Sequence, residues 1–533
     1  MSITVGTEHA VEPAVHTTVQ GCYDTLVDLD APIYVVHTAD GNGIGLSTHR
    51  PLDDATVIAA VGPLSPDRLG SAAFRAHHGV KYAYMGGAMA GGIASADYVI
   101  ALARAGYLGS FGAAGMLPAH VEAALQRFAA EIPGLPYAAN LIHSPSEAEL
   151  ERAAVELFLR YGVRCVEASA FMDVTPNIVR YRVAGLARSA DGGLIIGNRV
   201  IAKVSRAEVA EKFMRPAPEA MVADLVAAGL VTAEQAELAR LVPLADDITA
   251  EADSGGHTDR RPLTTLFPSL VRRRDQLRHE LNLPVRVRVG AAGGIGTPIA
   301  AAAAFAMGAD YIVTGSVNQS CLEAGTSSEV RHLLAQAGVA DVEMAPAADM
   351  FELGVELQVL KKGTMFAMRA KRLYELYCAY PGLDAVPAEE LAKLERQILR
   401  RTVDEVWQDV VEYFTRRDPD QLTRAAGDPK RKMALIFRWY LGMASRWAVV
   451  GDGDRGLDYQ IWCGPAMGSF NEWVRGSYLA AAENRRVVDV ARNLLHGAAF
   501  TTRVQQLALA GVRLPLDCGD YRPAPAEQIG DEL

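Results

Sequence analysis

Eight short apolar runs recur between residues 82 and 318, and each ends in glycine or polar residues. Helix-like segments such as SADYVIALARA and SEAELERAAVELFLRYG stand between them. Strands that alternate with helices indicate parallel βαβ units, and eight units match a (β/α)8 barrel of ~250 residues. We therefore predict an α/β chain built on a TIM barrel. The runs are YAYMGGAM (82–89), YLGSFGAAG (107–115), PYAANLI (136–142), CVEASAFM (165–172), RVIAKVS (199–205), ITAEADS (248–254), VRVRVGAAG (285–293) and YIVTGSVN (311–318).

An open, doubly wound sheet is the alternative fold. Such a sheet usually shows an early G-x-G-x-x-G turn, and none follows the first run. Between the fifth and sixth runs, a segment around 214–245 is long enough for extra helices, and its VTAEQAELARLV stretch carries a capping-box pattern from Thr232 to Gln235. We expect a helix pair inserted near the top or side of the barrel.

The flanks of the barrel, which we place at 76–330, divide into three parts. Residues 1–75 are predicted to form a small β-containing module, because PIYVVHTADGNGIGLS has the pattern of a hairpin with DGNG as its turn. Residues 331–518 show apolar positions at three- and four-residue steps, which predicts a mainly helical C-terminal region. We expect this region to cover the substrate mouth and to be available as a homodimer surface. The polar, proline-bearing tail 519–533 is predicted to be disordered.

The composition excludes several classes of protein. The net charge of -11 argues against nucleic acid or an anionic membrane as the main partner. No apolar run reaches the ~18–20 residues of a membrane span without interruption, and the first 20 residues lack the pattern of a signal peptide. Six scattered cysteines predict neither a disulfide framework nor a zinc site. A cytoplasmic protein without a metal is expected.

Candidate site residues stand where the predicted strands end, because the active site of a barrel lies at that face. The loop GGAMAGGIAS after the first run would let a flat ligand press against the backbone. Asn140 offers an amide that can donate and accept, and His257 follows two glycines in EADSGGHTDRRP, residues 251–262. The residues expected to bind a cofactor are Gly87, Ala88, Met89, Ala90, Asn140, Lys203, Gly293, Gly294, Gly315 and Ser316.

The loops after the seventh and eighth runs belong together. Glycine turns that open helices present N–H groups and a positive dipole end to an anion, and barrels often bind phosphate at these two loops. Gly293, Gly294, Gly315 and Ser316 therefore indicate a phosphate site. Ordinary turn chemistry is the other interpretation of these glycines.

Lys203 is a lone cation inside the apolar run VIAKVS. One interpretation is a core lysine that is held in a salt bridge or reaches to the surface. The other is a cation beside the electron-rich edge of a flavin, where it would stabilise negative charge on the reduced ring. The sequence leaves both open.

Five segments in order carry a resemblance to a known family: GAMAGGIAS, AANLI, EADSGGHTDRRP, AAGGIGTP and ADYIVTGSVNQ. They resemble the FMN barrels of the nitronate monooxygenase (2-nitropropane dioxygenase-like) family. More narrowly, they resemble the PfaD-type trans-acting enoyl reductases of polyketide and polyunsaturated fatty acid synthases. SGGHTDRRP is the most specific piece, and the resemblance also covers APIYVVHTADGNGIGLS and the C-terminal LGVELQVLKKGTMFAMRAKRLYELY.

The resemblance implies FMN as cofactor, NADPH or NADH as reductant and an enoyl thioester on an acyl carrier protein as substrate. His257 is then expected nearest the thioester, as acid or hydrogen-bond donor, and is paired with Lys203 as a catalytic candidate. Asp253, Ser254 and Arg260 are candidates for substrate contact or support. Asp253 could equally cap the following turn, and Arg260 could equally be surface charge.

Two other functions remain open at this point. One is an oxidase of the nitronate monooxygenase type on the same barrel, since fold does not fix function; the long helical C-terminal part and the SGGHTDRRP form favour the reductase. The other is a scaffold in a synthase that has lost its chemistry. Two basic runs, 272–274 and 430–432, are candidate docking patches for an acidic carrier protein, although most charge runs are solvated faces.

Overall fold

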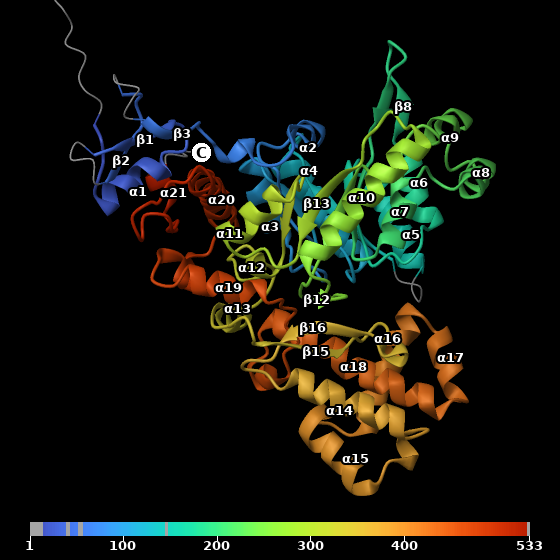
Figure 1. The fold of residues 1–533 in the computed structure, drawn as a ribbon. Coiled ribbons are helices and arrows are strands. Elements are labelled where there is room, and N and C mark those ends of the chain that lie inside the picture. Colours follow the sequence, from blue (N-terminus) through green and yellow to red (C-terminus); the bar gives the residue numbers. More distant parts are fainter. Residues whose placement is uncertain (1–13, 39–42, 52–56, 144–147, 530–533) are drawn as a thin grey trace, which may run out of the picture.

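The computed structural model describes residues 14–38, 43–51, 57–143 and 148–529. Eight parallel strands close into a barrel in the order β10-β11-β13-β14-β4-β5-β6-β7, and each overlaps one of the eight predicted runs (Figure 1). The prediction of a (β/α)8 barrel is therefore confirmed, and the open sheet is excluded. The strands are β4 (Tyr84–Gly86), β5 (Leu108–Phe111), β6 (Ala138–Ile142), β7 (Cys165–Ser169), β10 (Arg199–Val204), β11 (Asp247–Glu251), β13 (Arg288–Ala292) and β14 (Ile312–Thr314).

Helices surround these strands and bury their outer faces. Every residue of β5 and β13 is buried, as expected where helices cover a parallel sheet on one side and packed side chains fill the other. The helices that follow the strands are α3 (Ala96–Arg104), α4 (Pro118–Glu131), α5 (Ala148–Arg160), α6 (Pro176–Ala184), α7 (Ala207–Met214), α10 (Leu263–Leu281), α11 (Pro298–Ala306) and the short α12 (Ser316–Gln319).

The predicted insertion contains α8 (Glu219–Ala227) and α9 (Ala233–Ala239). The capping box at Thr232 is present, with both of its hydrogen bonds. The helix pair packs on α6 and beside an unpredicted hairpin of β8 (Leu186–Arg188) and β9 (Leu194–Ile196). Figure 1 shows this group at the upper right, away from β12 (Gly256–His257), which follows the carboxyl end of β11. The pair therefore lies at the side of the barrel, away from the carboxyl ends of its strands.

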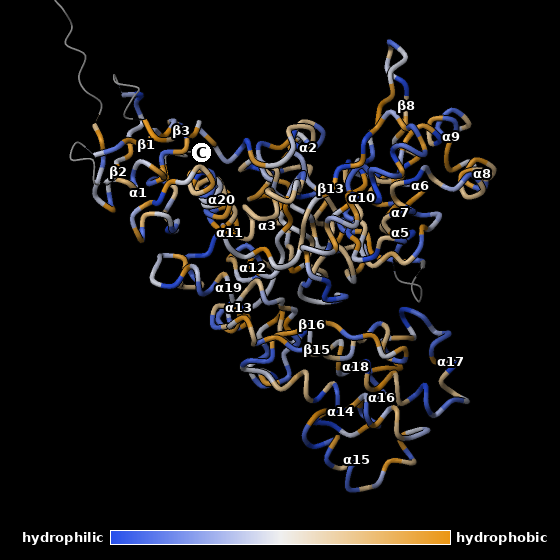
Figure 2. The backbone as a smooth tube through the Cα atoms, in the orientation of Figure 1, coloured by the Kyte–Doolittle hydropathy of each residue, from blue (hydrophilic) through white to orange (hydrophobic). Residues whose placement is uncertain are grey.

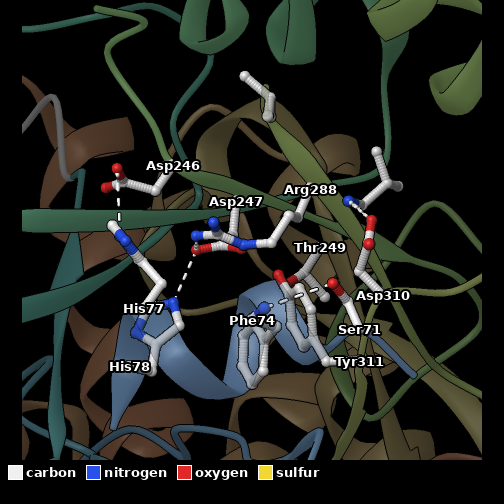
Figure 3. Close-up of polar contacts among 12 residues, drawn as sticks. Ser71, Phe74, His77, His78, Asp246, Asp247, Thr249, Arg288, Asp310 and Tyr311 are labelled. Atoms are coloured by element: carbon white, nitrogen blue, oxygen red, sulfur yellow. Dashed lines mark hydrogen bonds and ion pairs between the residues drawn. The ribbon is translucent and has the colours of Figure 1, made fainter. Parts of the chain in front are cut away.

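A buried polar network closes the amino-terminal ends of the strands (Figure 3). His78 on α2 (Ala72–His78) lies with Nε2 2.8 Å from Asp247 Oδ2, and Arg288 Nε donates to Asp247 Oδ1 at 2.6 Å. Burial lowers the pKa of His78 and outweighs the attraction of Asp247. Asp246 accepts two hydrogen bonds from Arg182. These contacts attach α2 to the first residues of β11 and β13 and so fix the base of the barrel.

The N-terminal module is a three-stranded antiparallel sheet in the order β2-β1-β3, with α1 (Val19–Val27) beside it. β1 (Ile33–His37) and β2 (Ile44–Ser47) pair as a hairpin, and β3 (Val57–Val61) lies on the other side of β1. The predicted DGNG turn lies outside the described residues, apart from Gly43. The C-terminal helix α20 (Val487–Leu509) packs on α1 and β3, so that the N-terminal module lies against the C-terminal region.

The C-terminal region is mainly helical, but it also contains a sheet that the sequence did not predict. β15 (Val342–Pro346) and β16 (Glu356–Leu360) pair with each other, and β12 of the barrel loop joins them in the order β12-β16-β15. This sheet connects the barrel to the helical part below it (Figure 1). The helices are α13 (Ser328–Ala335), α14 (Phe366–Ala379), α15 (Ala388–Leu394), α16 (Val403–Arg417), α17 (Asp420–Ala426), α18 (Pro429–Val450), α19 (Ala466–Trp473) and α21 (Ala526–Ile529).

The tail differs from its prediction of disorder. Tyr521 is buried, and its carbonyl accepts a hydrogen bond from Trp473 Nε1 at 3.2 Å. The Ala524 N–H donates to Asn493 Oδ1 at 2.8 Å. The polar composition was misleading because one aromatic ring and backbone hydrogen bonds attach 519–529 to α19 and α20. Residues 530–533 lie outside the described part.

Hydrophobic and hydrophilic residues alternate along the backbone in every part of the fold (Figure 2). Among the helices of the described residues, none is long and apolar enough to cross a membrane.

Candidate active site

One cavity of 580 Å³ lies at the carboxyl ends of the barrel strands, between the barrel and the C-terminal region. Its size falls in the range of ~300–1,000 Å³ that is typical of ligand and cofactor sites. Thirteen of the fourteen predicted site residues line it, and Arg260 does not. Those that line it are Gly87, Ala88, Met89, Ala90, Asn140, Lys203, Asp253, Ser254, His257, Gly293, Gly294, Gly315 and Ser316.

The predicted phosphate site is a glycine cradle formed by the loops after the neighbouring strands β13 and β14. Gly293 and Gly294 both have left-handed φ, at 84° and 73°, which favours glycine. A Cβ on Gly293 would come within 2.6 Å of the Ala252 carbonyl carbon. A Cβ on Gly294 or Gly315 would meet no protein atom within 4 Å, so both open into the cavity. The cradle therefore has room for a group that approaches the backbone.

The loop after β4 is held by a carboxylate on the opposite side of the barrel. Glu167 on β7 accepts a hydrogen bond from the Ala88 N–H at 2.8 Å, and its other oxygen has no hydrogen-bond partner although it is buried. Asn140 Nδ2 donates to the Glu167 carbonyl at 3.0 Å and to Ser169 Oγ at 2.8 Å. These contacts fix the floor of the cavity.

Lys203 reaches into the cavity between two carboxylates. Its Nζ lies 3.0 Å from Glu251 Oε1 and 3.9 Å from Glu167 Oε1. Burial disfavours the charged amine, but the negative charges of Glu251 and Glu167 outweigh it and raise the pKa of Lys203. The lysine is therefore a charged, salt-bridged residue that also lines the cavity, and its contact with a flavin stays a prediction.

His257 lies on β12, which pairs with β16 so that His257 is opposite Leu357. Its Nε2 lies 3.1 Å from Asp349 Oδ1. Burial disfavours the charged imidazole, but the hydrogen bond and charge of Asp349 raise the pKa of His257. The side chain keeps 37% exposure, at the cavity.

The two glycines before His257 let this turn pass close to another segment of the chain. A Cβ on Gly255 would lie 2.8 Å from the Cys463 backbone nitrogen, and Gly256 has φ of 78°. The close neighbour of Gly255 is thus the chain segment around Cys463, which comes from the C-terminal region. Gly255 and Gly256 both line the cavity as well.

Two of the three predicted support residues, Asp253 and Ser254, line the cavity, and Arg260 does not. Asp253 Oδ1 accepts a hydrogen bond from Gln358 Nε2 at 2.9 Å, and the Ser254 carbonyl accepts another from the same nitrogen at 2.8 Å. Both residues line the cavity while tying the turn to β16. Arg260 is exposed, has φ of 50° and does not line the cavity. These observations favour the interpretation of Arg260 as surface charge over a cofactor contact.

The two basic runs are largely used within the fold. Arg273 pairs with Glu211, and Arg274 is buried beside Asp275. Lys430 Nζ donates to the Tyr380 carbonyl at 2.7 Å, and Lys432 lies over the ring of Trp407. Most charges of both runs therefore have partners within the fold, while Arg272 is exposed, and a docking role for either run stays a prediction.

Sequence reasoning missed five acidic residues that line the cavity: Glu167, Glu251, Asp259, Asp349 and Glu356. Glu167 carried a signal of the kind that marked Lys203, because it is a charge inside the apolar run CVEAS. Asp349 carried none, since it lies in MAPAADMFELG, 92 positions from His257. Among the described residues, no group of three or more His, Cys, Asp or Glu side chains could hold a metal ion.

Comparison with protein families identifies the barrel. A family model described as nitronate monooxygenase matches residues 73–373, which include all eight barrel strands. The chain belongs to the nitronate monooxygenase family. A second family model, described as the inserted helical domain of acyl-carrier-protein S-malonyltransferase, matches residues 380–459 of this family member. That span holds α15 to α18.

Two curated relatives of this nitronate monooxygenase family member cover most of the chain. It is 50% identical over 490 residues to a polyunsaturated fatty acid synthase polypeptide of Thraustochytrium sp.. It is 46% identical over 433 residues to polyketide biosynthesis protein PksE of Bacillus subtilis. These matches cover 90% and 81% of the chain, but 32% and 56% of the relatives, so the chain spans part of their length.

A solved structure matches most of the chain. The crystal structure of the enoyl reductase domain of MlnA, from the macrolactin biosynthesis cluster of Bacillus amyloliquefaciens, is 38% identical with a TM-score of 0.79. The match covers 83% of this chain and 99% of that chain. It therefore extends beyond the family barrel into the flanking regions.

Proposed function

We propose that this chain is an FMN-dependent enoyl reductase that reduces α,β-unsaturated thioesters on an acyl carrier protein during polyketide or polyunsaturated fatty acid synthesis. The observation that carries the proposal is the match to the MlnA enoyl reductase domain over 99% of that domain. The two synthase relatives support the same context. In the overall reaction, NAD(P)H and a proton reduce the C=C bond to a saturated acyl thioester and leave NAD(P)+.

The residues of the cavity fit a flavin mononucleotide. Gly293, Gly294 and Gly315 form the cradle for its phosphate, with open space where two of their side chains would stand. The buried Glu167 oxygen without a hydrogen-bond partner and the cation of Lys203 lie at the cavity floor, where polar edges of the ring would meet them. When bound, the flavin supplies the two-electron chemistry that links the nicotinamide to the alkene.

The chain's own residues orient the substrate and move a proton. Hydride addition at the β-carbon places negative charge on the α-carbon and the thioester oxygen, which a positioned donor stabilises. His257 is the donor that we assign to this task, because it lines the cavity and its raised pKa keeps a proton available. Lys203 holds its positive charge between two carboxylates and stays available to the cofactor.

The carrier protein is the proposed partner. Its support comes from the family model of the inserted helical domain, which is described for an acyl-carrier-protein transferase and matches residues 380–459. That segment follows the sheet that holds His257, so a carrier bound to it would stand on the cavity side of the barrel.

The test is a visible spectrum of the purified protein, followed in one cuvette by anaerobic NADPH and then crotonyl thioester. A flavin band that NADPH bleaches and the enoyl thioester restores is the expected result. Reoxidation by a nitroalkane but not by the thioester would favour an oxidase of the nitronate monooxygenase type. Absence of a flavin band after incubation with FMN would overturn the cofactor and leave a scaffold as the better hypothesis.

A further inference from the structure

The C-terminal region supplies a carboxylate to a histidine of the barrel. Asp349 lies in the connection between β15 and β16, which is closed by a hydrogen bond from the Ala347 N–H to the Val355 carbonyl at 2.9 Å. β16 in turn pairs with β12, which carries His257. One sheet therefore holds both members of the pair that joins Asp349 Oδ1 to His257 Nε2 at 3.1 Å.

The charged groups around His257 come from four elements. Glu251 and Lys203 face it from β11 and β10 of the barrel, and their charges act on it in opposite directions. They also form an ion pair with each other at 3.0 Å, which leaves little net charge from that side. Asp349 faces it from the β15–β16 connection, and Arg438 on α18 acts on Asp349. Of these charged groups, Asp349 is the one that lies within hydrogen-bond distance of the imidazole.

We propose that Asp349 is a positioning residue that orients His257 and keeps it as an imidazolium at the cavity, so that the C-terminal region completes the proton donor of the barrel. This inference rests on the proposed reduction for its catalytic meaning, but the pairing itself does not depend on it. If Asp349 acts through His257, removing the Asp349 carboxylate changes the pH at which His257 loses its proton. A residue with a purely structural role would not have this effect.

The sign of the effect follows from the pair. Asp349 raises the pKa of His257, so the imidazolium persists to a higher pH than in an isolated histidine. Removing the negative charge stabilises the neutral ring, and the midpoint of titration falls. An opposite charge at hydrogen-bond distance shifts a pKa by ~1–3 units, and we expect about 1 unit because the pair is partly exposed to solvent.

The experiment measures the rate at which diethyl pyrocarbonate modifies His257, by mass spectrometry of its peptide across pH 5 to 9. The reagent attacks the neutral imidazole, so the rate reports the midpoint whether or not a flavin is bound. Asp349→Asn retains an oxygen acceptor and loses the charge, so the His257 midpoint is expected to fall by about 1 pH unit. Asp349→Glu retains the charge, and its midpoint is expected to stay within half a unit of the wild type.

His332 supplies the matched control in the same digest. Its Nε2 lies 2.6 Å from Glu483 Oε1 on an exposed surface, and the backbone carbonyl of Ser328 and the Glu483 carboxylate raise its pKa. Glu483→Gln should lower the midpoint of His332 and leave His257 unchanged. Asp349→Asn should do the reverse.

The kinetic result is separate from the titration. In Asp349→Asn, the upper limb of the kcat profile for crotonyl thioester should move to lower pH by the same amount, with KM within twofold of the wild type. An unchanged His257 midpoint in this variant would overturn the proposal. A shifted midpoint in a protein that does not reduce the thioester would sustain the pairing and refute the enoyl reductase instead.

Discussion

Gly315 tests the phosphate cradle at the scale of one atom. An added Cβ would meet no protein atom within 4 Å, and the φ of −127° is not in the left-handed region that favours glycine. Gly315→Ala should therefore fold with a melting temperature close to that of the wild type. Its methyl group would occupy space in the cradle, and we expect FMN to bind about tenfold more weakly, which is about 1.4 kcal/mol. Fluorescence titration of the apoprotein with FMN measures this.

The control for Gly315 is Gly427→Ala. Gly427 ends α17, also has open space around its Cβ and lies outside the cavity. It should change neither FMN affinity nor melting temperature appreciably. Equal FMN affinity in Gly315→Ala and the wild type would show that the phosphate lies elsewhere.

Lys203 has two roles that a pair of variants can separate. Lys203→Met leaves Glu251 and the buried Glu167 without their cation, and breaking a buried pair in this way costs about 3 kcal/mol. The double variant Lys203→Met with Glu251→Gln removes one of the stranded charges and should recover most of that stability. Neither variant should bind FMN as tightly as the wild type, because both lack the cation at the cavity.

Urea unfolding of the two apoproteins gives the stabilities, and FMN titration gives the affinities. Wild-type FMN affinity in the double variant would show that Lys203 is a structural lysine alone. Lys203 itself was predictable, since a charge inside an apolar strand is conspicuous. Its pairing with Glu251 and Glu167 was harder to predict. Which residues pair across a barrel depends on strand order and register, and one sequence does not specify these.

The turn from Asp253 to His257 shows where element-level reasoning stops. Two glycines before a histidine permit a close approach to the backbone. The pattern says nothing of what approaches, and the neighbour of Gly255 is the backbone of Cys463, more than 200 positions away. The strands β15 and β16 were missed for a related reason: their runs are short, and they are stabilised by pairing with each other and with β12.

Gln358 tests how the sheet of the C-terminal region holds that turn. The side chain is buried on β16, and its amide donates to Asp253 Oδ1 and to the Ser254 carbonyl. Gln358→Ala removes both hydrogen bonds, one of them to a carboxylate, and should cost about 2 kcal/mol. Hydrogen exchange measured by mass spectrometry should become faster in the peptide that contains 253–259.

The matched control is Gln421→Ala. Gln421 is also buried and also donates to a carboxylate, Asp418 Oδ2 at 2.9 Å, but it lies on α17. This variant should lose similar stability while exchange in 253–259 stays at the wild-type rate. Faster exchange there in both variants would mean that the turn responds to global stability and not to Gln358.

At the scale of the whole molecule, periodic features were predictable and contacts between distant segments were not. The eight strands repeat a local pattern, so they could be found one by one. The base of the barrel depends on His78 meeting Asp247, 169 positions away. The tail was predicted to be disordered from its polar composition, yet Tyr521 and Ala524 are fixed by α19 and α20. Such contacts between segments carry no periodicity.

Arg503 connects α20 to the N-terminal module through hydrogen bonds. It is fully buried on α20, and its guanidinium donates to the carbonyls of Asp28 at 2.6 Å and Ala31 at 2.7 Å, just beyond the end of α1. Burial lowers the pKa of Arg503 to about 10, which still leaves it charged at neutral pH. Arg503→Met avoids the cost of burying a charge, but it takes the arginine's hydrogen bonds away from both carbonyls. Each stranded carbonyl costs ~1–3 kcal/mol, so we expect a net loss of about 2 kcal/mol.

The loss should appear first in the N-terminal module, because the carbonyls belong to that module and the cavity is lined by residues within 87–356 and 462–466. Limited proteolysis should cut within 14–38 faster in Arg503→Met, while FMN affinity stays within twofold of the wild type. Arg513→Met, an exposed arginine just beyond α20, controls for the loss of one positive charge. If both variants were cut at the wild-type rate, the N-terminal module would be held by its apolar contacts with α20, and Arg503 would contribute no more than its share of the packing.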